Sequence, residues 1–268
     1  MREIKVSRIN VSEQTIEQRK DSVAEETPIH IFLNKTHYAT ILCSPDQLEE
    51  MAVGHLLSEG ILKSTDEIDE LLLKKDGKCL VKLKPDIDAE QRISTSQRFA
   101  RLVVSACGSP NYRSLSEVID SLPKLDMTPT LAANVISQSV RNLNSIAEKF
   151  RKTGGVHVAA LYSTDGELVA LAEDVGRHNA VDKVIGAGAT KKMDFRNLFL
   201  ALSGRLTGDI VLKAARMKIP VIASLAAAIS SGLEAAQVTR VTLIGFVRGK
   251  RMNIYTYPER IVFGARKV

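Results

Sequence analysis

Hydrophobic and polar positions are most clearly patterned between residues 154 and 186. Two short apolar runs, 156–161 and 168–171, flank an Asp165-Gly166 turn, and this arrangement predicts a β-hairpin. The second run leads into a cluster of polar residues at 173–183 that opens a predicted helix. A strand that delivers polar side chains to a helix N-terminus often builds a site in an α/β sheet. The pattern also fits a capped strand–helix joint without a ligand, and the density of polar residues in 174–182 favours the site.

Strands and helices alternate regularly after this hairpin. We expect helices at 179–188, 208–217 and 231–237, and strands at 198–202, 220–223, 241–247 and, last in the chain, 252–256. Strands that alternate with helices of this length predict a mostly parallel sheet with helices on both faces. The expected fold class is therefore α/β.

The N-terminal part of the chain is predicted to be smaller and rich in strands. Strands are expected within 1–34 and at 38–43, joined by a tight turn at 34–36. Ser44-Pro45-Asp46-Gln47 then predicts a helix start, with Ser44 as the cap and Pro45 at the first helical position. This helix is expected to end at Gly60. His55, on its apolar face, is interpreted as a packed residue rather than a ligand.

The connection between the two parts has a weaker pattern. We expect a short helix at 64–72, a strand at 79–84, a linker or mobile loop at 86–101, and a long helix that Thr128-Pro129 opens and that ends near 154–155. We place the domain boundary so that residues 1–112 form a strand-rich N-terminal domain and residues 113–268 form the α/β domain.

Three loops of the α/β part follow predicted strands, at the edge where open α/β sheets bind ligands. They span 174–178, 203–209 and 248–251. The loop that begins with Ser203-Gly204-Arg205 leads into a helix N-terminus and carries an arginine, which suits a phosphate group. Arg248, Lys250 and Arg251 are expected to hold a second phosphate or an extended anion.

Charge and composition narrow the classes of function. The net charge of the 268 residues is +6, and the segment from Arg248 to the end, with six Lys or Arg and one Glu, contributes +5 of it. A solvated basic tail is one interpretation, and an anionic ligand is the sharper one. No apolar run approaches the roughly 20 residues that span a bilayer. The start, Met-Arg-Glu-Ile-Lys-Val, lacks the apolar core of a secretory signal, so we expect a cytoplasmic protein with no membrane partner.

The three cysteines are widely spaced and odd in number, which argues against a disulfide scaffold and against a zinc site. Cys43 lies in an apolar strand, which predicts a buried structural thiol. Cys79 alternates with charged Lys78 and Lys82, which predicts a half-buried edge position. Cys107 lies in Ser-Ala-Cys-Gly-Ser-Pro, where the backbone can turn sharply and the thiol can be reached, so it is the candidate nucleophile.

Several motifs resemble those of a known family. They are Glu26-Thr27-Pro28, Ser44-Pro45-Asp46, Gly54-His55-Leu56-Leu57-Ser58-Glu59-Gly60, Ser105-Ala106-Cys107-Gly108, Thr153-Gly154-Gly155-Val156-His157, Glu173-Asp174-Val175-Gly176-Arg177-His178-Asn179-Ala180-Val181-Asp182-Lys183, Ser203-Gly204-Arg205 and Gly245-Phe246-Val247-Arg248-Gly249. The run at 173–183 is long and chemically specific. The chain is therefore identified as a member of the FdhD/NarQ family, the sulfur-carrier accessory proteins of formate dehydrogenases.

The resemblance implies a fold, partners and a reaction. The fold would have a cytidine-deaminase-like three-layer α/β/α core, and the protein would be a homodimer. The implied function is that of a sulfurtransferase, which accepts persulfide sulfur from a cysteine desulfurase. It then passes the sulfur to the bis(molybdopterin guanine dinucleotide) molybdenum cofactor, before the catalytic subunit of formate dehydrogenase takes this cofactor up. The cofactor is thus a bound substrate, and no structural metal is expected.

The resemblance also assigns residues. Cys107 is the implied persulfide carrier, and the implied cofactor-binding segment is Phe246, Val247, Arg248, Gly249, Lys250 and Arg251. Beyond the resemblance, we expect the loop residues Arg177, His178, Ser203, Gly204 and Arg205 to bind or orient the anionic cofactor. We expect His157 or His178 to handle protons, and a purely structural role for His157 is an equal alternative. Many members carry Cys-Gly-x-Cys, whereas this chain has Pro110 at the fourth position, which puts a two-cysteine relay in doubt.

Three other functions are alternatives to sulfur transfer for this sequence. A zinc deaminase needs His-x-Glu and Pro-Cys-x-x-Cys motifs, and the sequence contains neither pattern. An RNA-binding role has no stacking platform to point to, with only five Tyr and seven Phe, so no nucleic-acid partner is expected. The remaining alternative is a non-catalytic chaperone that binds the guanine-nucleotide-bearing cofactor and in which Cys107 has no role.

Overall fold

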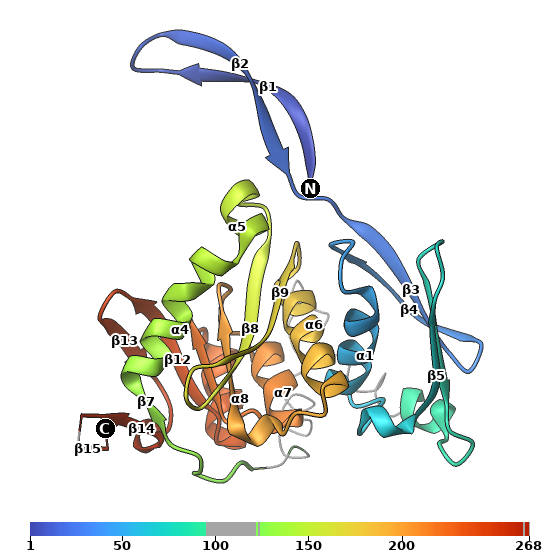
Figure 1. Cartoon of the computed structure of the whole chain (residues 1–268). Coiled ribbons are helices and arrows are strands. Elements are labelled where there is room, and N and C mark those ends of the chain that lie inside the picture. The colour runs from blue at the N-terminus through green and yellow to red at the C-terminus, as the bar shows by residue number, and fades with distance from the viewer. Residues whose placement is uncertain (95–121, 123, 265, 268) are drawn as a thin grey trace.

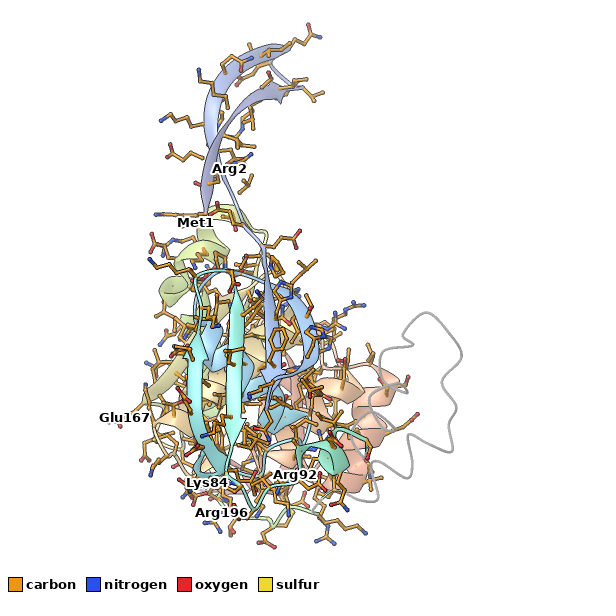
Figure 2. All side chains as sticks on the ribbon, turned by 90° about the vertical axis from the view of Figure 1, so that its right-hand side faces the viewer. Met1, Arg2, Lys84, Arg92, Glu167 and Arg196 are labelled. Carbon is orange, nitrogen blue, oxygen red and sulfur yellow. The ribbon has the colours of Figure 1, made fainter. Side chains whose placement is uncertain are left out.

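The computed structural model describes residues 1–94, 122, 124–264, 266 and 267. The chain begins with an antiparallel arm of two strands, β1 (Arg2–Asn10) and β2 (Thr15–Val23), which projects from the body of the molecule (Figures 1 and 2). The base of the arm lies against the turn before β8, because a Cβ atom on Gly155 would lie 3.3 Å from the Cβ atom of Ala24.

A four-stranded sheet follows the arm, with the order β4-β3-β6-β5. Its strands are β3 (Thr27–Leu33), β4 (Thr36–Cys43), β5 (Ile68–Leu73) and β6 (Lys78–Leu83). Two sequence predictions are wrong here. The helix expected at 64–72 is a short 3₁₀ turn, Thr65–Glu67, followed by β5. Cys79 lies on a central strand and is fully buried, because its alternating lysines face solvent while the cysteine faces the core.

The larger sheet has six strands in the order β13-β12-β11-β10-β8-β9. The strands are β8 (His157–Ser163), β9 (Leu168–Asp174), β10 (Leu198–Leu202), β11 (Val221–Ser224), β12 (Thr242–Arg248) and β13 (Arg251–Ile254). Only the pairs β10–β11 and β11–β12 are parallel, so the prediction of a mostly parallel sheet is wrong. Tight turns join β8 to β9 and β12 to β13, and a tight turn can only produce antiparallel neighbours.

Helices cover both faces of this sheet, as predicted (Figure 1). Alternate residues of β10 show the division, since Leu200 packs in the core with α6, α7 and α8, whereas Phe199 packs in the core with α4. The bounds are α4 (Ala133–Ile146), α6 (Arg177–Thr190), α7 (Gly208–Arg216) and α8 (Ser230–Thr239). The α/β class and the three-layer arrangement are therefore confirmed.

Several boundaries differ from the sequence predictions. Thr128-Pro129 precedes a short strand, β7 (Leu131–Ala132), and the helix begins only at Ala133. That helix is interrupted at Ala147 and continues as α5 (Glu148–Thr153). The expected linker contains a helical stretch at 89–94, and its later residues lie outside the described part.

The strand predicted to be the last one is followed by a 3₁₀ turn and two more strands. These are Pro258–Arg260, β14 (Ile261–Phe263) and β15 (Arg266–Lys267). Strand β14 pairs in parallel with β7. The two strands are far apart in the sequence, so no local sequence pattern predicts their pairing.

Helix α1 (Leu48–Ser58) joins the two parts of the molecule by crossing α6 at very close range. A Cβ atom on Gly54 would lie 1.7 Å from the Asp182 carbonyl oxygen, and one on Gly186 would lie 1.9 Å from the Glu50 carbonyl oxygen. One hydrophobic core runs from the four-stranded sheet through α1 to the six-stranded sheet. The predicted domain boundary at 112/113 falls outside the described residues and stays a prediction.

A buried polar cluster lies beside this crossing. The Asp182 carboxylate accepts hydrogen bonds from Ser58 Oγ at 2.6 Å and pairs with Lys213 Nζ at 2.9 Å and His55 Nδ1 at 3.0 Å. Burial opposes the charge on Asp182, but Lys213 and His55 lower its pKa to about 2. His55 is thus a packed, hydrogen-bonded residue, as the sequence predicted.

We expect Gly54→Ala to destabilise the protein by about 3 kcal/mol or more, because the added methyl group would overlap backbone atoms of α6 that cannot move independently. Urea unfolding followed by circular dichroism would measure the loss. Gly155→Ala is the control, since its Cβ atom would come no closer than 3.3 Å to any non-neighbouring atom, with Ala24 Cβ as the nearest and two Thr153 atoms at 3.7 and 3.9 Å. Equal stability of the Gly54→Ala variant and the wild type would show that the helices can separate without cost.

Candidate functional site

Four strands of the large sheet end at the same edge. Strands β10, β11 and β12 are parallel, and β9 runs in the same direction because β8 is antiparallel to both β9 and β10. The three loops singled out in the sequence, at 174–178, 203–209 and 248–251, therefore lie along one edge, where β8 and β13 also begin. We call it the carboxyl edge.

Asp174, the last residue of β9, fixes the start of α6. Its fully buried carboxylate pairs with Lys183 Nζ at 2.6 Å and accepts hydrogen bonds from the Gly176 backbone N–H and Asn179 Nδ2, both at 2.9 Å. The Ser44 backbone N–H donates to the same carboxylate at 2.9 Å. Four donors around one buried carboxylate hold the first turn of α6 in a single position.

Ser44 does not cap α1, which is a correction to the sequence analysis. The helix begins at Leu48 after Gln47, which has a φ of 52°, and no side chain caps it. Instead, Ser44 Oγ accepts a hydrogen bond from the Val175 N–H at 3.2 Å, and the Ser44 carbonyl accepts one from Lys183 Nζ at 2.9 Å. Ser44 does not cap α1 because its hydrogen-bonding groups instead contact Val175, just before α6, and Lys183 within α6.

Arg177, Ser203, Gly204 and His157 meet at the carboxyl edge. Ser203 Oγ accepts a hydrogen bond from the Val158 N–H at 2.9 Å and lies 3.5 Å from His157 Nδ1. A Cβ atom on Gly204 would lie 3.2 Å from the Cβ of Arg177 and 3.6 Å from His157 Nδ1, so glycine leaves room between these side chains. Arg177 Nε is buried and has no hydrogen-bond partner in the described structure. An unsatisfied donor beside a helix N-terminus suits an anion.

The charges around His157 decide its protonation. Burial lowers the pKa of His157 below 6.5, and the nearby positive charges of Arg177, His178 and Arg205 lower it further. The lowered pKa keeps His157 mainly neutral at pH 7, and compensation of the nearby positive charges would raise this pKa. This property fits a group that responds to a bound anion.

His178 has a partner of its own. Its Nε2 atom pairs with the Asp209 carboxylate at the start of α7, and His178 lowers the pKa of Asp209. The pair joins the first turns of α6 and α7, so His178 serves as a positioning residue in this structure. Arg205, on the loop between β10 and α7, is exposed and makes no ion pair with a described residue, which leaves its charge free for a ligand.

The segment 246–251 lies farther along the same edge, at the turn between β12 and β13. Phe246 is 38% exposed and has a φ of 51°, and the Arg248 guanidinium carbon lies 5.7 Å from the centre of its ring. Gly249, with a φ of 59°, makes the tight turn. Val247 points into the core and is fully buried, whereas Arg248, Lys250 and Arg251 are exposed.

The loop after β11 connects the two charged groups and was missed by the sequence analysis. Ser224 Oγ donates to the Gly204 carbonyl at 2.6 Å, while the Leu225 carbonyl accepts from Arg248 Nε at 3.4 Å. Only β11 lies between β10, which leads into Ser203 and Gly204, and β12, which ends at Arg248. At a strand spacing near 4.8 Å, these two points stand about 10 Å apart. The signal was available, since this loop also follows a strand of the alternating pattern.

Of the three cysteines, Cys43 and Cys79 lie in the described part of the chain. Cys107 lies outside the described residues. Cys43 and Cys79 are fully buried, and burial raises their pKa values to about 11 and about 12. Neither of these two can serve as a reactive surface thiolate at neutral pH. Among the described residues, no group of three or more His, Cys, Asp or Glu side chains is arranged to hold a metal ion.

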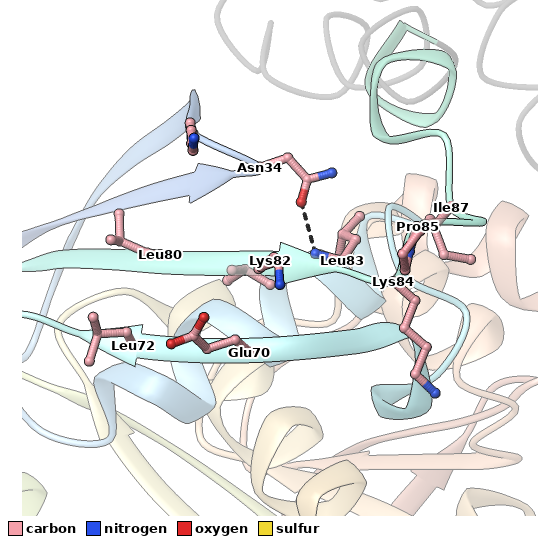
Figure 3. Close-up of a pocket in the computed structure, with 11 residues that line it drawn as sticks. Asn34, Glu70, Leu72, Leu80, Lys82, Leu83, Lys84, Pro85 and Ile87 are labelled. Carbon is pink, nitrogen blue, oxygen red and sulfur yellow. Dashed lines mark hydrogen bonds between the residues drawn. The ribbon is translucent and has the colours of Figure 1, made fainter.

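A separate pocket of about 450 Å³ lies on the outer face of the four-stranded sheet (Figure 3). The Asn34 side chain closes one side by accepting a hydrogen bond from the Leu83 N–H at 2.8 Å. Its lining mixes aliphatic side chains such as Leu72 and Leu80 with Glu70 and Lys82. It contains none of the residues predicted to be functional.

The fold and the carboxyl edge define an α/β protein that presents exposed positive charges along one edge of its large sheet. Residues 24–262 match the model of the FdhD/NarQ family, and the chain belongs to this family.

The alignments with similar proteins cover nearly the whole chain. The sulfur carrier protein FdhD of Methanothermobacter thermautotrophicus is 36% identical over 97% of this chain and 98% of its own, and that of Sulfolobus acidocaldarius is 35% identical over 97% and 98%. The crystal structure of a protein described as a formate dehydrogenase accessory protein, from Desulfotalea psychrophila, matches with a TM-score of 0.78 and 30% identity over 97% and 98% of the two chains. None of the described helices combines the length and hydropathy of a membrane span.

We expect the pKa of His157 to lie below 6.5 in the free protein and to rise when an anion binds at the carboxyl edge, because the anion compensates the charges of Arg177 and Arg205. The pKa can be followed by NMR titration of the imidazole with and without inorganic pyrophosphate. The Arg177→Gln variant should start from a higher pKa. If pyrophosphate left the pKa of His157 unchanged, the anion would not bind beside this residue at the carboxyl edge.

Proposed function

We propose that this protein is a sulfur carrier of formate dehydrogenase maturation. It accepts persulfide sulfur from a cysteine desulfurase on Cys107 and transfers it to the bis(molybdopterin guanine dinucleotide) molybdenum cofactor. The support comes from membership of the FdhD/NarQ family, from full-length relatives that are named sulfur carrier proteins, and from the cationic carboxyl edge.

The assignment of the carrier thiol to Cys107 rests on the other two cysteines. Since Cys43 and Cys79 are buried and their pKa values are raised, a sulfur donor cannot reach them without unfolding the core. Cys107 is the remaining cysteine of the sequence. Its neighbours, Ser-Ala before it and Gly-Ser-Pro after it, are small or turn-forming residues, which suits an accessible nucleophile.

The proposed transfer has two steps. In the first, the Cys107 thiolate attacks the terminal sulfur of the donor's cysteine persulfide, so the donor S–S bond breaks, a new S–S bond forms on Cys107 and the donor cysteine leaves as a thiolate. In the second, the terminal sulfur moves to molybdenum and Cys107 returns to the thiolate. The two electrons that convert this sulfur to sulfide would come from the reduced metal centre of the cofactor, which is the substrate of this step.

The carboxyl edge would bind the anionic parts of the cofactor. Arg248, Lys250 and Arg251 present exposed positive charges on one turn, and the exposed ring of Phe246 offers a surface for a purine base. The Arg177–Gly204–Arg205 region lies two strands away and provides a second place for a phosphate or another anionic group. His157, neutral in the free protein, would take up a proton when the anion arrives.

The proposal includes partners. The sulfur donor is a cysteine desulfurase, the recipient of the loaded cofactor is the catalytic subunit of formate dehydrogenase, and the working unit is a homodimer in the cytoplasm. The competing function is a cofactor-binding chaperone without sulfur chemistry. It keeps the carboxyl edge and gives Cys107 no role, so Cys107 decides between the two.

We expect the wild type to gain one sulfur atom when it is incubated with cysteine desulfurase and cysteine, and the Cys107→Ala variant to gain none. Intact-protein mass spectrometry measures the gain, and a reducing agent should remove it. Cys43→Ala is the matched control and should load normally, because its thiol is buried. The chaperone would be favoured if neither the wild type nor the Cys107→Ala variant gained sulfur while both proteins bound the guanine nucleotide with the same affinity.

We expect the double substitution Arg248→Ala, Arg251→Ala to weaken the binding of GDP, used as a probe for the guanine nucleotide, by about tenfold or more, since each arginine supplies a charge-assisted contact to phosphate. Calorimetric titration gives the dissociation constants. Lys74→Ala, Lys75→Ala is the control, with the same change in charge on the distant β5–β6 turn. Unchanged GDP affinity in the Arg248 and Arg251 variant would remove this turn from the proposed binding site.

A further inference from the structure

A groove runs along the edge of the large sheet opposite to the carboxyl edge. It consists of two adjoining cavities of about 690 and 520 Å³, which share Asp194, Arg196 and Lys218 as lining residues. Figure 2 places Arg196 at the end of the molecule far from the arm. We call this feature the amino-edge groove. None of the residues predicted to bind the cofactor lines it.

The groove combines an apolar surface with excess positive charge. Leu62, Phe195 and Met217 contribute apolar lining. Six Lys or Arg and three Asp side chains line the two cavities. Asp194 pairs with Arg196 at 2.8 Å, and Asp66 pairs with Lys192 at 3.7 Å. Lys63, Lys124 and Lys218 form no ion pair with any residue that the structure describes. The groove therefore offers uncompensated cations beside an apolar surface.

Two of the lysines occupy unusual backbone positions. Lys192 follows α6 with a φ of 54° and Lys218 follows α7 with a φ of 62°. At both positions the helix ends in a turn of the Schellman type, closed by hydrogen bonds from Met193 N to Gly188 O at 3.0 Å and from Ile219 N to Ala214 O at 2.9 Å. Glycine is the residue that this conformation favours. The favourable interaction of a cation with a helix C-terminus offsets part of the strain, but glycine would avoid the strain altogether, so the lysine side chains are candidates for a binding role.

The chemistry of the lining selects one kind of occupant. The only aromatic side chain in the described lining, Phe195, is 8% exposed, so nucleic-acid bases find no stacking surface. An acidic protein segment with interspersed apolar side chains matches both the cations and the apolar lining.

The position of the groove indicates which partner would use it. The chain leaves the described structure at Ser94, two residues after Arg92, whose Nη1 atom donates to the Ile61 carbonyl at 3.1 Å beside the groove residue Leu62. It returns at 122–125, and Lys124 and Leu125 line the smaller cavity. Described residues on both sides of the segment that contains Cys107 therefore lie next to the groove, so a protein docked there would contact the flanks of that segment.

We propose that the amino-edge groove is the docking surface for an acidic segment of the sulfur donor, the cysteine desulfurase. This inference rests on the proposed function. Docking at the amino edge leaves the carboxyl edge free for the cofactor, so loading of the thiol and binding of the cofactor do not compete for one surface.

Two double variants test the proposal. Lys192→Glu, Lys218→Glu reverses both charges, and Lys192→Gly, Lys218→Gly removes them while relieving the backbone strain. The matched control is Lys74→Glu, Lys75→Glu on the exposed β5–β6 turn. Affinity for the cysteine desulfurase of the same organism is measured by calorimetry at about 0.15 M salt, and persulfide on Cys107 by mass spectrometry. Sodium polysulfide, which loads an accessible thiol without a protein donor, shows whether the thiol itself is intact.

We expect the Glu variant to bind the desulfurase about tenfold more weakly and the Gly variant to bind it more weakly while its midpoint of thermal unfolding stays equal or rises. Both variants should load slowly from the desulfurase but normally from polysulfide, and the control should behave as the wild type. Wild-type affinity in both groove variants would overturn the proposal, as would an equal loss in the control. Failure of the wild type to load from the desulfurase would count against the proposed function itself, and the affinities would still show whether the groove binds this protein.

Discussion

The buried ion pair between Asp174 and Lys183 is the interaction on which the rest of the structure depends. Both side chains are withdrawn from water, and their charges are tolerated because Ser44, Gly176 and Asn179 complete the hydrogen bonding. Removal of one partner from such a pair typically costs about 3–5 kcal/mol. The pair links the end of β4, the end of β9 and the first turns of α6, so the N-terminal sheet and the candidate site share one anchor. The Asp174 carboxylate holds the first turn of α6 in place, and it thereby fixes the positions of Arg177 and His178, which lie in that turn.

The close crossing of α1 and α6 complements the ion pair. Gly54 and Gly186 allow the two backbones to touch, and the cluster of Asp182, Lys213 and His55 compensates the buried charge beside them. Together these contacts make the small N-terminal sheet part of the same core as the large sheet. This rigidity keeps the loops of the carboxyl edge at a fixed spacing, which the proposed binding of a large anionic cofactor would require.

The two edges of the large sheet differ in chemistry, although both are basic. At the carboxyl edge, helix N-termini, a buried unsatisfied Arg177 Nε and a neutral His157 favour a compact anion such as a phosphate group. At the amino edge, lysines beside an apolar surface favour an acidic segment of protein. The common direction of β9, β10, β11 and β12 produces this division, because it places the starts of α6, α7 and α8 at one edge and their ends at the other.

The sequence by itself determined the alternation of strands and helices after residue 154, the β8–β9 hairpin, the turn predicted at 34–36 and the three loops of the carboxyl edge. It could do so because hydrophobic periodicity and turn residues are local signals. It could not determine that Ser44 would leave its capping role for Asp174 and Val175, that Cys79 would lie on a central strand, or that β14 would pair with β7. Each of these depends on a partner far away in the sequence. The same reason explains why Arg177, Gly204 and His157 could be suspected one at a time, whereas their meeting, and the lowered pKa of His157 that follows from it, was decided only by the tertiary structure.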